Sequence, residues 1–124
     1  MTKNKQQSMA QMLLLEYRPT IWRKAALKAV LGTSDMVLQT CIERLRYTQE
    51  LVESLRGSKY VGDKLYWIIY ASYMTEQQPK DVEEILADIA LRYKYISRRT
   101  YFRLKGRAIS MMNGLLNKRH KYFN

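Results

Sequence analysis

The sequence predicts an all-α fold, in which a helical scaffold is followed by a C-terminal helix-turn-helix. Only five Gly and two Pro occur in 124 residues, which is unusual for a β-rich or disordered chain. Good helix formers such as Leu, Met, Ala, Glu, Lys, Arg and Gln dominate the composition. Hydrophobic residues make up 47% of the chain, enough for a core, and in the longer segments they recur every three or four residues.

Two short helices are expected near the N-terminus. Residues 9–17 are apolar enough for the first, which should end near Tyr17 or Arg18 because Pro19 disfavours helical backbone in the residue before it. The second helix is predicted over residues 20–31, and Gly32 should end it.

A long third helix is predicted from a cap at Thr33 or Ser34 to about Arg56, with Gly57 ending it. Six residues at alternating spacings of three and four form its apolar stripe: Leu38, Cys41, Leu45, Thr48, Val52 and Leu55. The stripe is typical of a coiled coil, but it is short and includes Cys and Thr, so packing against neighbouring helices is the favoured interpretation.

The next helix, residues 64–74 with Asp63 as its cap, is apolar almost all round and is therefore expected in a core or an interface. Its aromatic side chains are also a candidate base-stacking platform, although burial is favoured. Pro79 and the acids from Asp81 onward should open a further helix that ends around residues 91–93.

The last helix is predicted from Arg98 to about Asn117, after a turn over residues 93–96 and a cap at Ser97. Its apolar stripe consists of Tyr101, Leu104, Ala108, Met111 and Leu115. The opposite face carries Arg99, Phe102, Arg103 and Gly106.

Positive charge is concentrated at the C-terminal end. Residues 1–88 hold twelve basic and eleven acidic residues, a net charge of +1, whereas residues 89–124 hold ten basic residues and no acid, a net charge of +10. A field of one sign over an amphipathic helix favours a polyanionic partner such as nucleic acid.

Residues 81–107 have the spacing of a helix-turn-helix, in which the start of the second helix enters the DNA major groove. Ile96 is expected to plug the turn into the core. The predicted base-reading residues are Arg98, Arg99, Phe102 and Arg103, because arginine can bond guanine O6 and N7 and phenylalanine can contact a thymine methyl group. The predicted phosphate contacts are Lys94, Thr100, Lys105 and Arg107. Beyond them, Lys118, Arg119, His120 and Lys121 are expected to form a flexible basic tail.

The segment 66–112, above all ISRRTYFRLKGRAI at 96–109, resembles the C-terminal part of the ArpU/RinA-type phage transcription regulators. These small proteins of Gram-positive phages and prophages are linked to late-gene transcription, and their ending is similar to region 4 of sigma factors. The matching positions are Ser97, Arg98, Arg99, Thr100, Tyr101, Arg103, Lys105, Ala108 and Ile109. The resemblance implies a helix-turn-helix and a role in phage transcription. Residues 92–95 (RYKY) depart from it, since a glycine-containing turn is usual there, and residues 1–60 match nothing in the family.

Enzymatic functions are not expected, and no catalytic residue, metal or cofactor is predicted. His120 is the only histidine and Cys41 the only cysteine, so together they cannot form a metal site, and no glycine-rich phosphate loop is present. Asp81, Glu84 and Asp88 share a helix face and could be imagined around Mg²⁺, but acids at a helix start are more simply explained by the helix dipole. The same acids are a candidate contact for a protein such as RNA polymerase.

A cytoplasmic protein is expected. The longest uncharged run, residues 65–75, has eleven residues, and a membrane-spanning helix needs about 20. The N-terminus lacks the long apolar segment and cleavage site of a signal peptide, and a lone cysteine suits a reducing compartment.

The sequence thus predicts a DNA-binding transcription regulator of phage or prophage genes that recognises double-stranded DNA through the major groove. Residues 1–60 are assigned to a helical region that is a candidate homodimer interface, and residues 61–124 to the helix-turn-helix with its basic tail. The alternative is a non-catalytic packaging or interaction protein that binds DNA without sequence preference or docks on an acidic protein.

Overall fold

The computed structural model describes residues 8–31 and 35–123, and every regular element among them is helical, which confirms the all-α fold class. The elements are α1 (Met9–Leu15), α2 (Tyr17–Leu31), α3 (Met36–Glu53), the 3₁₀ turn η1 (Ser54–Gly57), α4 (Gly62–Ile69), the π-helical turn η2 (Tyr70–Met74), α5 (Val82–Arg92) and α6 (Arg98–Phe123).

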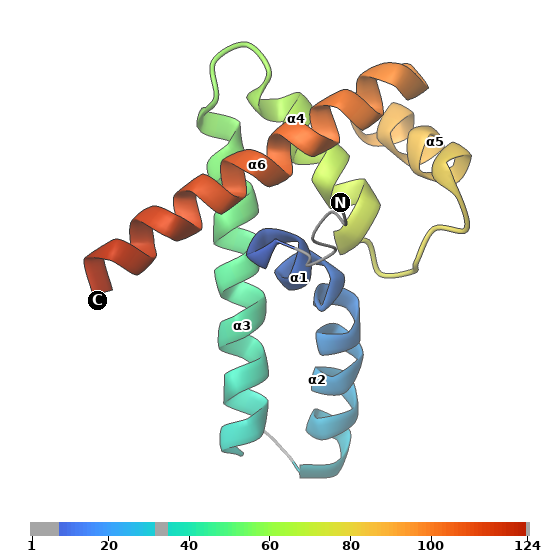
Figure 1. The fold of residues 1–124 in the computed structure, drawn as a ribbon. Coiled ribbons are helices and arrows are strands. Elements are labelled where there is room, and N and C mark those ends of the chain that lie inside the picture. The colour runs from blue at the N-terminus through green and yellow to red at the C-terminus, as the bar shows by residue number, and fades with distance from the viewer. Residues whose placement is uncertain (1–7, 32–34, 124) are drawn as a thin grey trace, which may run out of the picture.

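The long helix α6 runs diagonally across α4, α3 and α1 (Figure 1). Helices α2 and α3 form an antiparallel hairpin that extends away from this crossing, and α5 lies beside the N-terminal end of α6 (Figure 1). The hydrophobic core lies where these helices meet, and it includes Leu14 of α1, Leu51 of α3, Ile68 of α4, Ile89 of α5 and Met112 of α6. Residues from both halves of the chain therefore build one core.

The junction between α1 and α2 is earlier than predicted. Helix α1 ends at Leu15, and α2 begins at Tyr17, so that Pro19 lies inside the first turn of α2 rather than ahead of a helix at Thr20. Proline is tolerated there because the first amides of a helix have no intrahelical acceptor. The prediction of a helix end at Tyr17 or Arg18 was wrong for this reason.

Helix α3 is capped by Asp35, whose Oδ1 accepts hydrogen bonds from the amides of Val37 (2.7 Å) and Leu38 (3.4 Å). The predicted caps Thr33 and Ser34, like the predicted stop Gly32, lie outside the described residues. The predicted stripe is confirmed, because all six of its residues are buried: Leu38, Cys41, Leu45, Thr48, Val52 and Leu55. The stripe packs against α2 and the core of the same chain.

Helix α4 begins one residue before Asp63, so the prediction that Asp63 is its cap was wrong. The start is set instead by a tight approach of backbone, because a Cβ atom on Gly62 would lie 2.4 Å from the carbonyl oxygen of Arg56. Most of the segment 65–74 is buried as predicted, while Tyr66, Trp67 and Tyr70 are half-buried and pack edge-on and stacked against one another.

Helix α5 is capped by Asp81, whose Oδ1 accepts a hydrogen bond from the Glu84 amide (2.9 Å). Pro79 lies three residues ahead of Val82 and outside the helix, which corrects its predicted place in the first turn. Ile89 is the fully buried residue of the predicted apolar face.

Helix α6 continues to Phe123, beyond the predicted end at Asn117. Tyr101, Leu104 and Ala108 are buried as predicted, but the buried positions then move to Met112 and Leu116, and Met111 and Leu115 are only half-buried. The shift arises because a straight helix has 3.6 residues per turn, so that a stripe drawn with a seven-residue repeat drifts around its surface.

Candidate nucleic-acid interface

The candidate interface is built on α5, the segment 93–97 and the first turns of α6. Helix α5 ends where the Tyr93 amide donates to the Ile89 carbonyl (2.8 Å). Ile96 is only 4% exposed, so it plugs the connection into the core as predicted. Among described non-glycine residues only Tyr60 has a positive φ. The connection therefore reverses the chain without the left-handed backbone that usually calls for glycine, which explains how residues 92–95 can lack one.

Ser97 caps α6 as predicted. Its Oγ accepts a hydrogen bond from the Thr100 amide at 3.2 Å and donates one to Thr100 Oγ1 at 3.0 Å. A capping serine satisfies one of the free amides of the first turn. The start of the helix is thereby fixed at Arg98.

A buried pair of hydroxyl groups anchors the rear of α6 to η2. Ser72 Oγ lies 2.6 Å from the Ile68 carbonyl and 2.7 Å from the Tyr101 hydroxyl. Because a serine has one proton, which goes to the carbonyl, Tyr101 must be the donor to Ser72. This contact holds the first turns of α6 at a fixed orientation.

The four predicted base-reading residues share the free face of α6, opposite the buried Tyr101 and Leu104. All four are exposed: Arg98, Arg99, Phe102 and Arg103. Phe102 is 48% exposed although it is a large apolar side chain, and the Arg98 guanidinium lies 5.6 Å from the centre of its ring. The structure thus gathers this set on one surface.

The predicted phosphate-contacting residues differ in how exposed their side chains are. Lys94 and Arg107 are exposed, whereas Thr100 is half-buried and its hydroxyl already belongs to the cap at Ser97. Lys105 is half-buried too, with its ammonium 5.3 Å from the Tyr73 ring and 5.7 Å from the Tyr101 ring. Lys94 and Arg107 are therefore the exposed cations of this set, and the Lys94 ammonium lies 5.1 Å from the centre of the Tyr93 ring. Lys118 is exposed, and the side chains of Arg119, His120 and Lys121 lie outside the described part of the chain.

Three residues of this surface were not singled out as site residues from the sequence. Glu83 of α5 forms an ion pair with Arg98 across the two helices. Tyr95 and Leu91 are 75% and 87% exposed, beside the turn. The sequence held a signal for Tyr95, an aromatic residue in a basic turn, but the Glu83–Arg98 pairing depends on how α5 and α6 are placed.

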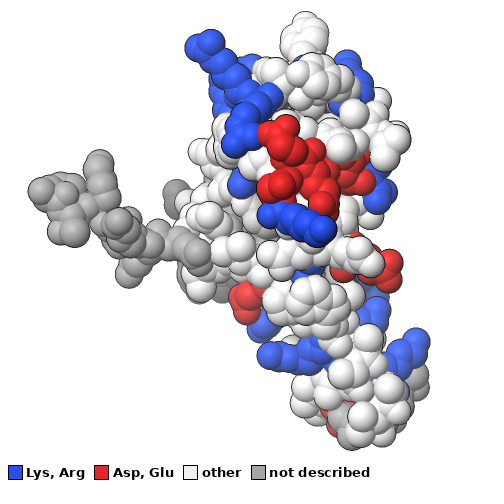
Figure 2. Space-filling model, turned by 90° about the vertical axis from the view of Figure 1, so that its right-hand side faces the viewer, with Lys and Arg blue, Asp and Glu red and all other residues white. Residues whose placement is uncertain are grey.

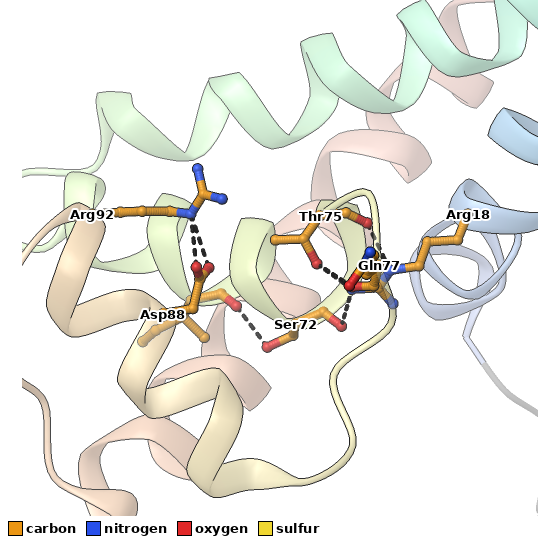
Figure 3. Close-up of polar contacts among 7 residues, drawn as sticks. Arg18, Ser72, Thr75, Gln77, Asp88 and Arg92 are labelled. Carbon is orange, nitrogen blue, oxygen red and sulfur yellow. Dashed lines mark hydrogen bonds and ion pairs between the residues drawn. The ribbon is translucent and has the colours of Figure 1, made fainter.

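Acidic side chains gather on α5, next to the basic start of α6. Figure 2 shows this acidic cluster with basic side chains above and below it. The acids of α5 and its cap are Asp81, Glu83, Glu84 and Asp88. Arg92 donates to both oxygens of Asp88 (2.9 and 3.0 Å; Figure 3), and this hydrogen bond raises the pKa of Arg92. A duplex seated on α6 would therefore border a surface that repels phosphate, which restricts how it can lie.

The surface of α5 and α6 presents charged and aromatic side chains that can form ion pairs, hydrogen bonds and stacking contacts. No group of three or more His, Cys, Asp or Glu side chains in the described residues is arranged to hold a metal ion, the set Asp81, Glu84 and Asp88 included. The Cys41 thiol is buried between α2 and α3. Over the described ranges, no helix is both long and apolar enough to cross a bilayer.

Comparison with protein-family models, with curated proteins and with solved structures gave no match to this chain.

Proposed function

We propose that this protein is a sequence-specific double-stranded DNA-binding transcription regulator, in which α5 and α6 act as a helix-turn-helix. The observation that carries the proposal is the exposed set of Arg98, Arg99, Phe102 and Arg103 on the first turns of a helix whose rear face is buried. Exposed arginines at the start of a helix that projects from its support are suited to the major groove.

Each member of the set has a distinct role in this proposal. Arg99 and Arg103 are four residues apart and lie on one line of the helix, so that they can reach successive bases and bond guanine O6 and N7. Phe102 lies between them and suits the methyl group of thymine. Arg98 joins them once it leaves Glu83.

The cations outside this set supply affinity rather than selectivity. Lys94 at the turn and Arg107 further along α6 flank the base-reading face and suit the two phosphate backbones. The proposed mechanism is therefore binding without chemistry, carried out in the cytoplasm on phage or prophage DNA, as the resemblance of residues 96–109 implies. The hairpin of α2 and α3 is the proposed homodimer interface, since it presents exposed apolar side chains such as Trp22, Met36 and Val37.

The test is binding of the full chain to labelled duplexes tiled across its own genomic neighbourhood, with random competitor DNA at two salt concentrations. One duplex held at least about 10³-fold more tightly than the others at physiological salt is the expected result. Uniform binding that is lost as salt rises would overturn the proposal in favour of a packaging or interaction protein. The oligomeric state separates the two classes further, because a dimer fits a two-fold operator and a ring of many subunits fits packaging.

A further inference from the structure

A second candidate site lies beside the cap and the first turn of α5, at Asp81, Val82 and Ile85. A cavity of about 270 Å³ opens between the end of α1, the start of α2, η2 and α5. Its walls combine four apolar side chains with five polar ones, which are Arg18, Ser72, Tyr73, Gln78 and Asp81. Pockets for small ligands have this composition, with apolar walls and a few polar groups that fix orientation.

Arg18 is the most unusual residue of this cavity, because it is a buried cation with only neutral partners. It is 8% exposed, and it donates from Nε to the Thr75 carbonyl (2.8 Å) and from Nη2 to the Ser72 carbonyl (3.2 Å) and Thr75 Oγ1 (2.9 Å; Figure 3). Among the described residues no carboxylate forms an ion pair with Arg18, and its Nη1 has no hydrogen-bond partner. No fully buried side-chain nitrogen or oxygen of the described residues lacks a partner, so the Arg18 Nη1 is accessible to solvent. Because buried charges in proteins are normally paired, an anion that enters the cavity would gain a favourable interaction with Arg18.

The neighbouring polar groups favour a carboxylate over other anions. A tyrosine hydroxyl is protonated at neutral pH, and burial raises the pKa of Tyr73 further. This hydroxyl has no hydrogen-bond acceptor among the described residues. It is thus a second donor that lines the same cavity as Arg18. Apolar Leu15, Val82 and Ile85 leave little surface for a strongly hydrated, multiply charged ion such as phosphate.

The cavity on the other flank of α5 serves as a contrast. It has a similar volume of about 270 Å³, but Glu76, Glu84 and Asp88 line it, and its Arg92 is already bound to Asp88. In Figure 3 the Arg92–Asp88 pair and the Arg18–Thr75 contacts lie on opposite sides of η2. The cavity at Arg92 thus has three carboxylates and a paired cation, whereas the cavity at Arg18 has one carboxylate, Asp81, and a cation without an acidic partner among the described residues, so an anion should favour the cavity at Arg18.

We propose that the Arg18 cavity binds a small organic carboxylate with an apolar body, with the carboxylate on Arg18 and the body against Val82 and Ile85. Asp81 stands at the same cavity, with Oδ1 engaged by the Glu84 amide, and it could receive the ammonium group of an α-amino acid. Ser72 lines the cavity and accepts the Tyr101 hydrogen bond of α6, so an occupant contacts the support of the proposed recognition helix. An effect of the ligand on DNA binding rests on the proposed function, whereas binding of the ligand does not.

The test is calorimetric titration of the full chain, without DNA, with 4-methylpentanoate and with its neutral amide at constant ionic strength. Saturable binding of the carboxylate, with the amide at least about tenfold weaker, is expected because a charge-assisted hydrogen bond to Arg18 is lost. Leucine identifies the source of the carboxylate: tighter binding than 4-methylpentanoate indicates an amino acid, and weaker binding indicates a simple fatty acid. Equal binding of acid and amide, or no saturable binding of any of the three, would overturn the proposal.

Variants of Arg18 and Gln78 test whether the ligand binds in this cavity. Arg18→Gln should abolish the preference for acid over amide, whereas Arg23→Gln, which removes an exposed cation of the same helix, should leave it unchanged. Because loss of Arg18 could also disturb η2, Gln78→Trp at the exposed rim provides a second test that leaves the core intact. It should block binding by filling the entrance. Binding that survives both Arg18→Gln and Gln78→Trp would place the ligand elsewhere and contradict the assignment.

Discussion

At the scale of single residues, Arg98 is shared between two roles. It pairs with Glu83 of α5 and belongs to the proposed base-reading face. Both side chains are more than half exposed, so the pair contributes little to stability. Its main consequence is that a duplex must compete with Glu83 for Arg98.

The variant Glu83→Gln should therefore bind DNA a few-fold more tightly than the parent protein. The change releases Arg98 and removes a negative charge beside the phosphates, and exposed pairs of this kind are worth about 0.2–1 kcal/mol. Duplex affinity at fixed salt measures the effect. Glu50→Gln on α3 is the matched control, since it removes an exposed acid that is distant in sequence from α5 and α6. Equal gains in the two variants would show that only net charge matters.

Tyr73 makes stability depend on pH in the alkaline range. Burial raises the pKa of its hydroxyl above the ordinary value of 10.0, so the folded chain keeps a proton that the unfolded chain has released. The contribution of Tyr73 to the free energy of unfolding is therefore complete below pH 10 and is lost as pH rises through the folded pKa.

Tyr73→Phe should accordingly reduce the decline in stability above pH 10. Part of the decline should remain in Tyr73→Phe, because the pKa of Tyr66 is also raised, mainly by burial. Denaturant unfolding at a series of pH values measures the decline in the free energy of unfolding, and Tyr60→Phe is the exposed control. An identical decline in Tyr73→Phe and the parent protein would refute this assignment.

At the scale of elements, the start of α4 depends on the absence of a side chain at Gly62. A Cβ there would lie 2.4 Å from the Arg56 carbonyl oxygen, so Gly62→Ala must displace backbone and should cost about 1–3 kcal/mol of stability. Gly114→Ala in α6 is the matched control, because its Cβ would meet nothing within 4 Å. That variant should gain about 0.5–1 kcal/mol from helix propensity. Thermal unfolding compares them, and a Gly62→Ala variant as stable as Gly114→Ala would contradict the packing.

The spacing of apolar residues predicted the helices better than the capping and helix-ending residues did. The stripe from Leu38 to Leu55 and the cap at Ser97 follow from local spacing alone, and both are confirmed. The cap expected at Asp63 was wrong because α4 begins one residue earlier, at Gly62, where the backbone packs closely against Arg56. The π-helical turn η2 could not be predicted from local spacing, since its Ser72 carbonyl accepts a hydrogen bond from Arg18, 54 residues away along the chain.

The candidate site was predictable to a similar degree. An exposed face on α6 follows from the placement of Tyr101 and Leu104, which local spacing gives. The ion pair of Arg98 with Glu83 and the seating of Lys105 over tyrosine rings come from packing between elements. The Arg18 cavity is assembled from segments distant in sequence, and no local pattern indicates it.

At the scale of the whole molecule, α6 ties the two ends of the chain together. Its first turns carry the proposed DNA-reading face, and further along Asn113 Oδ1 accepts a hydrogen bond from the Ala10 amide of α1 (2.9 Å). The core contains residues of α1 and α3 as well as of α4, α5 and α6. The N-terminal helices are thus part of the support of α6.

A fragment of residues 61–124 should therefore fail to fold stably by itself, because removal of α1 and α3 exposes apolar residues such as Leu65 and Met112. Circular dichroism during heating should show one cooperative transition for the full chain and a weak, gradual one for the fragment. A fragment that unfolds cooperatively near the temperature of the full chain would contradict a shared core.

The concentration of charge gives the molecule one basic end, with ten basic residues and no acid beyond residue 88. Such an end binds any polyanion, so affinity alone cannot distinguish a regulator from a nonspecific binder. The distinction lies in whether particular arginines discriminate between DNA sequences.

The most direct test is the affinity of Arg99→Ala and Lys118→Ala for the best duplex and for random DNA, measured at one physiological salt concentration. The account predicts that Arg99→Ala loses about 1–3 kcal/mol on the best duplex and little on random DNA, while Lys118→Ala weakens both alike. An equal loss on both DNAs for Arg99→Ala would make Arg99 a phosphate contact and would contradict base recognition by α6.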